Sequence, residues 1–465
     1  MTDEGKPLKS EFTLSSSRNM NHMDLKKTLR KVGGAAYRVT HSGTMRVLNE
    51  LRAANARMDA LEAETSRNRA LLESMRSDAV HNKAFYLVCE PGYPNYGDEL
   101  IAAEWLKYLA ATHPETPVVL DCKRPGPASV ILRGLHPHCT VVDTVSRITF
   151  ENVYADGDIS RGAVGDIARF LHGVLDNEGL AARYASGVHL LRDGVRSVHF
   201  LGGGYMNGTW TANLARLELG AWAHEKGLPV LATGTGLMPL SAEASQYVQE
   251  TVSRFDRFSV RDERSFDALG GATNAVLSPD DCFVNALEGC YAPADQLPDV
   301  MICVQSDLVD DSEALYRHIF SMLEVWNVTA EDTIGVVECN PYLDRPIFDR
   351  LEESGFSPVF FPATFLLEQG FPAREGQRWI TTRYHPHILA AAKGCAGAYV
   401  CVNREYYGVK HEAVKRMGSR WSESVIGEPV PAPGPGFADR DAPYKFARQI
   451  RQVASVLYGQ SAVRL

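Results

Sequence analysis

The feature that most constrains the fold is a repeated alternation of short apolar runs with helical stretches. A first series of apolar runs, each about as long as a strand, comprises "FYLVCE", "PVVLDC", "SVHFLGGG", "LPVLATGTG" and "RFSVRD". Helical stretches lie between several of them, for example at 98–112 and 211–226. Strands that alternate with helices in this way predict a parallel sheet covered by helices.

A second series begins at "DVMICVQ" (299–305) and repeats the pattern with helices at 312–326 and 346–354. Its further strands are expected at "TIGVVECN", "RWITTRY" and "GAYVCVN". The stretch 288–299 between the two series is rich in Pro, acids and small residues, which is typical of a linker. We therefore expect an α/β protein with two Rossmann-like domains, at 84–290 and 298–425, that face a central cleft. A Pro/Gly loop and a C-terminal helix should occupy 426–465, with the helix returning to the first domain.

Residues 1–83 form an N-terminal extension outside this alternation. Apolar residues from Val47 to Met75 recur at spacings of four and three, which predicts a long helix at 45–77. Thr65 and Asn68 make the centre of the stripe polar. The helix could associate with a copy of itself, pack on the rest of the chain, or remain solvated without a partner, and the sequence leaves these options open.

Charge and composition exclude several classes of partner. The chain has 465 residues and a formal net charge of −9, and this acidic balance argues against nucleic acid as the main partner. It contains no apolar stretch long enough for a membrane span and no apolar segment of the secretory type near its start. We expect a cytoplasmic protein, either free or peripheral at the membrane.

The nine cysteines predict neither disulfides nor a metal site. They form no C-x-x-C pair, and several lie within apolar runs, where a thiol behaves as a small hydrophobic side chain. No G-x-G-x-x-G opens a helix after a strand and no G-x-x-x-x-G-K-[ST] loop occurs, so no nucleotide cofactor is expected. We therefore predict a site that uses neither a metal nor a cofactor.

Basic residues directly follow several predicted strands. Arg261 follows "RFSV", Arg383 and His385 follow "WITT", and Lys410 comes after "AYVCV". Ligands of open α/β sheets bind at the carboxyl ends of the strands, and Arg matches carboxylate and phosphate geometry two bonds at a time. The three cations favour a small molecule with two anionic groups, and His385, just before a helix, is placed to act as a general acid.

Glycines and acids occupy other strand ends. Glycine there lets a ligand approach the backbone, or allows close packing of helix on sheet. The candidate cleft glycines are Gly97, Gly203, Gly204, Gly234 and Gly236. Asp98 and Glu99 open the helix after the first strand, where they either shape a ligand site or cap the helix.

The ordered set of motifs resembles the polysaccharide pyruvyl transferase family. The resemblance covers roughly residues 84–420 and rests on "NYGDELI", "FLGGGYM", "ATGTGLMP", "SVRDERSFDAL", "SPDDCFV", "TRYHPHILAAAKG" and "REYYGVKHEAVKRMG". The sequence departs from the family pattern at "GTGLMP", where the family often has "GxGIGP", at Pro386 after the R-x-H motif, and in its long N-terminal region.

The resemblance implies a fold like that of two-domain glycosyltransferases and a transfer of pyruvyl from phosphoenolpyruvate onto two hydroxyls of a glycan or lipid-linked sugar. By position, Arg261, Arg383 and Lys410 would bind the donor and His385 would be the catalytic acid. Asp98 would take the proton of the acceptor hydroxyl.

Two other functions remain open at this point. The same scaffold could carry a nucleotide-sugar glycosyltransferase, which should bind a nucleotide diphosphate in the cleft. A non-catalytic carbohydrate-binding or scaffold protein could instead use the helix at 45–77 to assemble.

Overall fold

The computed structural model describes Met58 and residues 64–66, 83–93, 95–155, 162–305, 309, 311–402 and 408–459, without the side chains of 152–155. The chain divides into two compact units, residues 1–73 and 74–465. In the first unit the described residues are Met58 and residues 64–66, which are helical and exposed. Most of the predicted helix at 45–77 thus lies outside the described residues, and its self-association stays a prediction. The second unit contains all the described strands.

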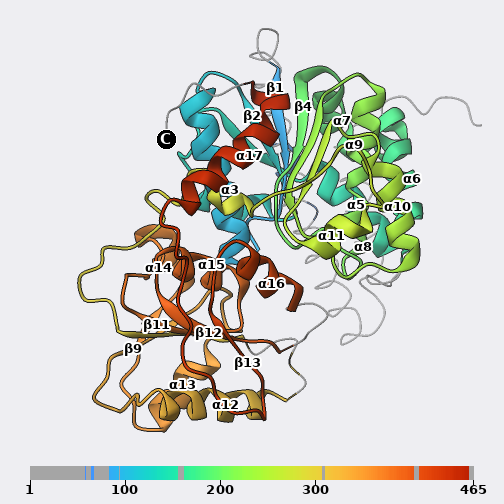
Figure 1. Cartoon of the computed structure of the whole chain (residues 1–465). Coiled ribbons are helices and arrows are strands. Elements are labelled where there is room, and N and C mark those ends of the chain that lie inside the picture. The colour runs from blue at the N-terminus through green and yellow to red at the C-terminus, as the bar shows by residue number, and fades with distance from the viewer. Residues whose placement is uncertain are drawn as a thin grey trace, which may run out of the picture. The chain divides into compact units, whose positions relative to one another are not determined.

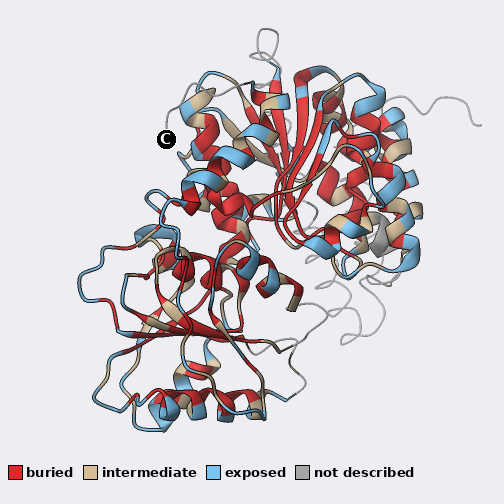
Figure 2. Ribbon diagram, in the orientation of Figure 1, coloured by how far each residue is buried: buried red, intermediate tan, exposed pale blue. Residues whose placement is uncertain are grey.

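The first half of this unit is built on a seven-stranded sheet with the order β3-β2-β1-β4-β5-β6-β7. Every neighbouring pair in it is parallel. The strands are β1 (Ala84–Val88), β2 (Val118–Asp121), β3 (Cys139–Val142), β4 (Val195–Phe200), β5 (Val230–Thr235), β6 (Arg257–Val260) and β7 (Ala275–Leu277). Because both faces are covered, the inner strands are almost continuously buried (Figure 2).

The second half repeats this plan in a six-stranded sheet with the order β10-β9-β8-β11-β12-β13, which is also parallel throughout. Its strands are β8 (Val300–Cys303), β9 (Ile334–Val337), β10 (Val359–Phe361), β11 (Arg378–Thr381), β12 (Ala396–Val400) and β13 (Ser422–Ser424). In each sheet the first three strands are added side by side in one direction, and the fourth strand then pairs with the other side of the first strand. This is the Rossmann order, so the predicted fold class of two Rossmann-like α/β domains is confirmed.

Helices connect the strands and cover the sheets (Figure 1). The first half contains α3 (Tyr96–Thr112), α4 (Pro125–Ile131), α5 (Thr144–Ala155), α6 (Val164–Asp176), α7 (Ala185–His189), α8 (Thr211–Leu214), α9 (Leu217–Glu225), α10 (Ala242–Val252) and α11 (Glu263–Ala268), with short turns η2 (Glu178–Tyr184), η3 (Leu190–Gly194) and η4 (Asp281–Phe283). The second half contains α12 (Ser312–Val325), α13 (Pro346–Glu353), α14 (Ala363–Gln369), α15 (Tyr384–Ala392) and α16 (Val409–Arg416). No helix in the described part of the chain has the length and apolarity that a membrane crossing requires.

The last helix, α17 (Ala442–Tyr458), returns to the first sheet after the Pro/Gly loop (Figure 1). Its final residue, Tyr458, is buried and packs edge-on against Phe85 of β1, with 4.8 Å between ring centroids. Nδ1 of His199 on β4 and the Tyr458 hydroxyl lie 2.8 Å apart in a hydrogen bond. These contacts fix the end of the described chain to the first sheet.

Candidate active site

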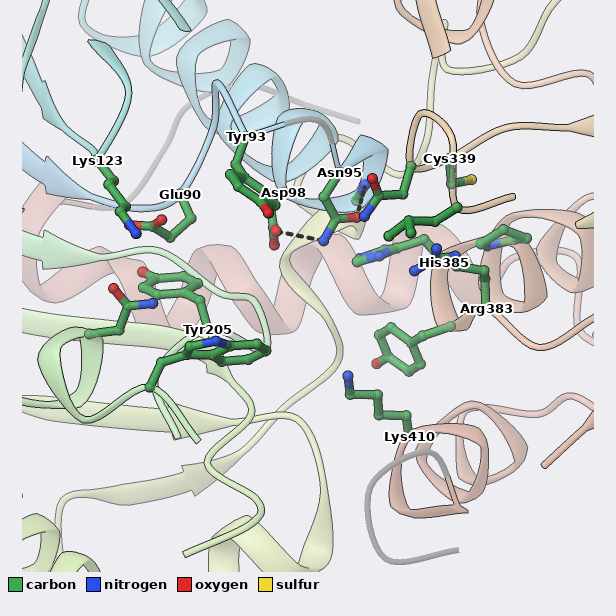
Figure 3. Close-up of a pocket in the computed structure, with 18 of the residues that line it drawn as sticks. Glu90, Tyr93, Asn95, Asp98, Lys123, Tyr205, Cys339, Arg383, His385 and Lys410 are labelled. Atoms are coloured by element: carbon green, nitrogen blue, oxygen red, sulfur yellow. Dashed lines mark hydrogen bonds between the residues drawn. The ribbon is translucent and has the colours of Figure 1, made fainter. Parts of the chain in front are cut away.

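A cleft of about 330 Å³ lies at the carboxyl ends of the strands and takes lining residues from both sheets (Figure 3). Its size is at the lower end of the range found for small-molecule pockets. Residues that line it lie in the loops after β1, β2, β4, β6, β9 and β11, and others come from α3, α15 and α16. Parallel strands place their carboxyl ends at one edge of each sheet, and the cleft takes residues from both of these edges, which is why residues so far apart in the sequence meet here.

Arg261 follows β6 and is almost completely buried. Its Nη1 donates to Oδ2 of Asp280 at 2.7 Å, and its guanidinium lies over the ring of Tyr384, 4.4 Å from the centroid. Burial opposes the charge on Arg261, but the nearby Tyr384 and Asp280 raise its pKa above the usual value. Asp280 and Tyr384 therefore hold a permanent cation in the wall of the cleft.

Arg383 follows β11 and is held in the same manner by a different carboxylate. Its Nε donates to Oδ1 of Asp344 at 2.9 Å, and its Nη2 donates to the same oxygen at 2.5 Å. Asp344 is fully buried and also accepts the backbone N–H groups of Cys339 and Asn340, both at 2.9 Å. Asp344 therefore fixes the orientation of the Arg383 guanidinium.

Lys410 lies in the first turn of α16 and also lines the cleft. The pKa of its ammonium falls well below the usual value, because burial and the charge of Arg261 outweigh the attraction of Asp98. A Cβ on Gly204 would lie 2.9 Å from Nη2 of Arg261 and 3.5 Å from Nζ of Lys410, so both cations approach the same glycine. The structure thereby brings together the three cations that the sequence places at strand ends.

His385 lies in the first turn of α15 and points toward the start of α3, as Figure 3 shows. Its Nε2 is buried, has no hydrogen-bond partner among the described residues, and lies 3.7 Å from Oδ1 of Asp280. Burial alone would raise the pKa of Asp280, but His385 and Arg261 hold it well below its usual range. A Cβ on Gly97 would overlap the His385 imidazole, so the glycine in "NYGDEL" allows α3 and α15 to meet.

Asp98 does not cap α3. The cap is Asn95, whose Oδ1 accepts the N–H of Gly97 at 3.3 Å, and whose Nδ2 donates to Oδ2 of Asp98 at 2.7 Å (Figure 3). Burial raises the pKa of Asp98 to about 6 against the attraction of His385, Arg261 and Lys410. Asp98 lines the cleft, and its pKa lies near the neutral range.

The remaining predicted cleft glycines are not all in the cleft. Gly97 and Gly204 line it, whereas Gly203, Gly234 and Gly236 are not among the lining residues. A Cβ on Gly234 would lie 2.7 Å from Oδ1 of the buried Asp281, and one on Gly236 would lie 3.1 Å from Nε of Arg261. Gly203 has a φ of 137°, a backbone conformation that glycine adopts without strain. The three glycines Gly203, Gly234 and Gly236 leave room for the neighbouring side chains of Tyr205, Asp281 and Arg261, respectively.

The sequence profile of the polysaccharide pyruvyl transferase family matches residues 95–400, roughly two thirds of the chain. The chain belongs to this family. The match spans every strand from β2 to β12 and includes Asp98, Arg261, Arg383 and His385. Lys410 lies just beyond it. A comparison with curated proteins finds no match.

Solved structures with a similar arrangement of elements share little sequence with this pyruvyl transferase family member. A putative UDP-N-acetylglucosamine 2-epimerase from Listeria monocytogenes is 12% identical, with 82% of this chain and 91% of that chain covered and a TM-score of 0.43. UDP-GlcNAc 2-epimerase from Neisseria meningitidis, bound to UDP-GlcNAc, is 10% identical over 81% and 95%, with a TM-score of 0.42. MurG from Acinetobacter baumannii is 12% identical over 81% and 94%, with a TM-score of 0.41. Similarity this low says nothing about what the chain binds.

Sequence reasoning missed the two carboxylates that hold the arginines of this family member. Asp280 follows "VLSP" at a strand end, so its position was a usable signal, but nothing in the sequence pairs it with Arg261. Asp344 lies in the loop between β9 and α13, where no periodic pattern marks it. Asp344 acts on the cleft through Arg383, and Asp280 acts through Arg261 and through the nearby His385.

One group of described side chains, Cys303, Cys339 and Asp344, has ligand atoms within 4.8 Å of one another, close enough for a metal ion. The two sulfur atoms are 3.8 Å apart. However, the Asp344 carboxylate already accepts the Arg383 guanidinium and two backbone N–H groups. This donor set suits the positioning of Arg383 better than the binding of a metal.

Proposed function

We propose that the protein transfers the pyruvyl unit of phosphoenolpyruvate to two hydroxyls of a saccharide, forming a cyclic ketal and releasing phosphate. The observation that carries this proposal is the convergence of Arg261, Arg383 and Lys410 beside His385 at one end of the cleft. We call these four residues the cationic end.

The cationic end suits a small molecule with a carboxylate and a phosphate close together. Asp280 and Asp344 each offset one guanidinium, whereas the low pKa of Lys410 reflects an ammonium crowded by burial and by Arg261. A bound dianion would relieve that crowding, because each anionic group would face a cation at short range. Phosphoenolpyruvate carries both groups on a three-carbon frame.

The reaction needs an acid and a base on opposite sides of the donor. His385 would protonate the methylene carbon of phosphoenolpyruvate, which makes C2 electrophilic, and Asp98 would take the proton from the sugar hydroxyl that attacks C2. Phosphate then leaves with the bridging oxygen, and a second hydroxyl closes the ketal on C2. The products are one ketal and one inorganic phosphate for each phosphoenolpyruvate consumed.

A turnover experiment tests this proposal against the two alternatives from sequence. The intact protein is incubated with phosphoenolpyruvate, or with UDP-sugars, and a mixed extract of glycans and glycolipids. Inorganic phosphate release with formation of an acid-labile pyruvate ketal on a saccharide is expected with phosphoenolpyruvate. Sugar transfer from a nucleotide donor would favour the glycosyltransferase, and no turnover with either donor would favour the non-catalytic protein.

A further inference from the structure

The cleft continues past Asp98 into a second region with different chemistry. Figure 3 shows Glu90, Tyr93 and Lys123 on the far side of Asp98 from Arg383, His385 and Lys410. We call this region the aromatic end and define it by the lining residues Glu90, Tyr93, Lys123, Phe150, Trp210 and Asn213. The proposed donor chemistry uses none of them.

The side chain of Asn213 carries a buried hydrogen-bond acceptor. It is 6% exposed, it lines the cleft, and its Oδ1 has no hydrogen-bond partner among the described residues. Leaving a buried acceptor without a donor costs about 1–3 kcal/mol. A ligand hydroxyl at this position would supply the missing hydrogen bond.

Glu90 supplies a second acceptor with a fixed orientation. Its Oε1 accepts a hydrogen bond from Nη1 of Arg216, which is wholly buried. The Arg216 guanidinium in turn lies 5.4 Å from the centroid of Phe150, and Nζ of Lys123 lies 3.8 Å from the same ring. The Glu90 carboxylate is thereby anchored in the wall, with the ammonium of Lys123 nearby.

Two aromatic side chains at this end are unusually exposed for their size. Tyr93 is 46% exposed and Trp210 is 41% exposed, and both line the cleft. An apolar ring surface in a concave site with a few polar groups is typical of a binding site. A pyranose presents an apolar face of C–H bonds and an edge of hydroxyls, which matches rings beside Asn213 and Glu90.

We propose that the aromatic end binds the terminal pyranose of the acceptor saccharide. Trp210 and Tyr93 pack on its apolar face, Asn213 and Glu90 hold hydroxyls on its edge, and the remaining hydroxyls face Asp98. This inference rests on the proposed function. A nucleotide fits less well, because the Glu90 carboxylate would repel its phosphates and Lys123 alone would have to hold them.

The test measures the binding of donor and saccharide separately in the intact protein. Calorimetry follows phosphoenolpyruvate, and saturation-transfer NMR follows a panel of p-nitrophenyl glycosides of glucose, galactose, mannose, N-acetylglucosamine and N-acetylmannosamine. The wild type should bind at least one glycoside. Trp210→Ala and Asn213→Ala should each weaken that binding by about tenfold or more, which corresponds to the loss of one aromatic contact or one hydrogen bond. Both should keep their affinity for phosphoenolpyruvate.

Matched variants separate this role from a structural one. Trp210→Phe keeps a ring and should restore most of the glycoside binding, and Tyr444→Ala, which removes a ring 37% exposed on α17 outside the cleft lining, should have no effect. The inference is overturned if no glycoside binds while phosphoenolpyruvate does, if UMP or UDP binds at this end instead, or if Trp210→Ala leaves glycoside binding unchanged. Failure of the wild type to bind phosphoenolpyruvate would instead contradict the proposed function.

Discussion

Two carboxylates near His385 have opposite pKa shifts, and their surroundings explain the difference. Both are pushed upward by burial, but Asp280 lies against His385 and Arg261 and its pKa is held well below the usual range. At Asp98 burial outweighs the attraction of His385, Arg261 and Lys410, and the pKa is raised to about 6. Asp280 therefore remains an anion that fixes its neighbours, whereas Asp98 can exchange a proton near neutral pH, as a general base must.

The pH dependence of turnover should report Asp98. Because only its ionised form accepts a proton, kcat/KM should fall about tenfold per pH unit below a pKa of about 6. The Asp98→Asn variant should fold and should bind phosphoenolpyruvate at least as well as the wild type, because the substitution removes an anion beside the cations. Its turnover should be about 10²–10⁴-fold slower. Calorimetry and initial rates measure both effects.

The phosphate of the donor titrates in the same pH range, so the variant is also the control. The acid limb that Asp98 causes should be missing from the residual activity of Asp98→Asn. An identical acid limb in the variant and the wild type would assign the limb to the donor and remove Asp98 from the role of base.

Arg383→Lys should be severely impaired although the charge is kept. A lysine at this position loses the two-nitrogen contact with Asp344 and the fixed direction of the guanidinium, so we expect a loss of about 2–3 kcal/mol of transition-state binding. The measurement is kcat/KM, with thermal unfolding as a check on the fold. Near-normal turnover at saturating donor would show that turnover does not need the two-nitrogen contact between Arg383 and Asp344.

At the scale of elements, the start of α3 determines how closely the cationic end can assemble. Asn95 caps the helix, and the missing side chain of Gly97 leaves room for the His385 ring at the start of α15. The backbone N–H of Tyr96 also donates to the carbonyl of Cys339 at 2.9 Å, which ties the same turn to the end of β9. One turn of a helix in the first half therefore contacts two segments of the second half.

Gly97→Ala should abolish activity. The added methyl group overlaps the imidazole, so His385 must leave its position, and we expect a loss of about 1–3 kcal/mol in stability together with loss of turnover. Gly165→Ala in α6 is the matched control, because its Cβ would have 3.8 Å to the nearest atom, on Arg169. It should change the stability by less than about 1 kcal/mol, because Gly165 lies in the first turn of α6, and keep full activity. Activity assays and denaturant unfolding of both variants check this, and an active Gly97→Ala enzyme would contradict the role of this turn.

The inner strands could be predicted from sequence, whereas three of the four edge strands could not. Buried inner strands such as β1 and β8 are continuous apolar runs, and such runs predict buried strands. The strands β3, β10 and β13 were not predicted, and each lies at the edge of its sheet. They are short and partly exposed, as in "VFF" and "SES", so no long apolar run marks them. A single helix was predicted at 211–226, and this was wrong. The structure has two helices there, α8 and α9, which are separated at the buried Arg216.

The residues of the candidate site also divide into those that the sequence predicts and those that it does not. Arg261, Arg383 and His385 could be found because they come soon after inner strands, at the carboxyl edge of each sheet. Asp344 could not, because this loop residue meets Arg383 only when β9 and β11 are placed on either side of β8 in the folded sheet. The unsatisfied oxygen of Asn213 also depends on side-chain packing, which the sequence does not specify.

At the scale of the whole molecule, the cleft belongs entirely to the unit formed by residues 74–465. Deletion of residues 1–78 should therefore leave the affinity for phosphoenolpyruvate unchanged, because every lining residue lies between Glu90 and Lys410. The oligomeric state could change if the predicted helix at 45–77 associates with itself. Calorimetry and sedimentation of the truncated and full chains measure the two properties. Loss of donor binding in a folded truncated protein would contradict this separation.

The most direct test of the central claim follows the bridging oxygen of phosphoenolpyruvate. Pyruvyl transfer breaks the bond between C2 and this oxygen, whereas hydrolysis or phosphoryl transfer breaks the bond between the oxygen and phosphorus. The donor is labelled with a heavy oxygen isotope at the bridge and incubated with the protein and its saccharide acceptor, and the products are analysed by mass spectrometry. We expect the label in the released phosphate and an unlabelled pyruvate ketal on the sugar; label retained in free pyruvate, with unlabelled phosphate, would contradict the account.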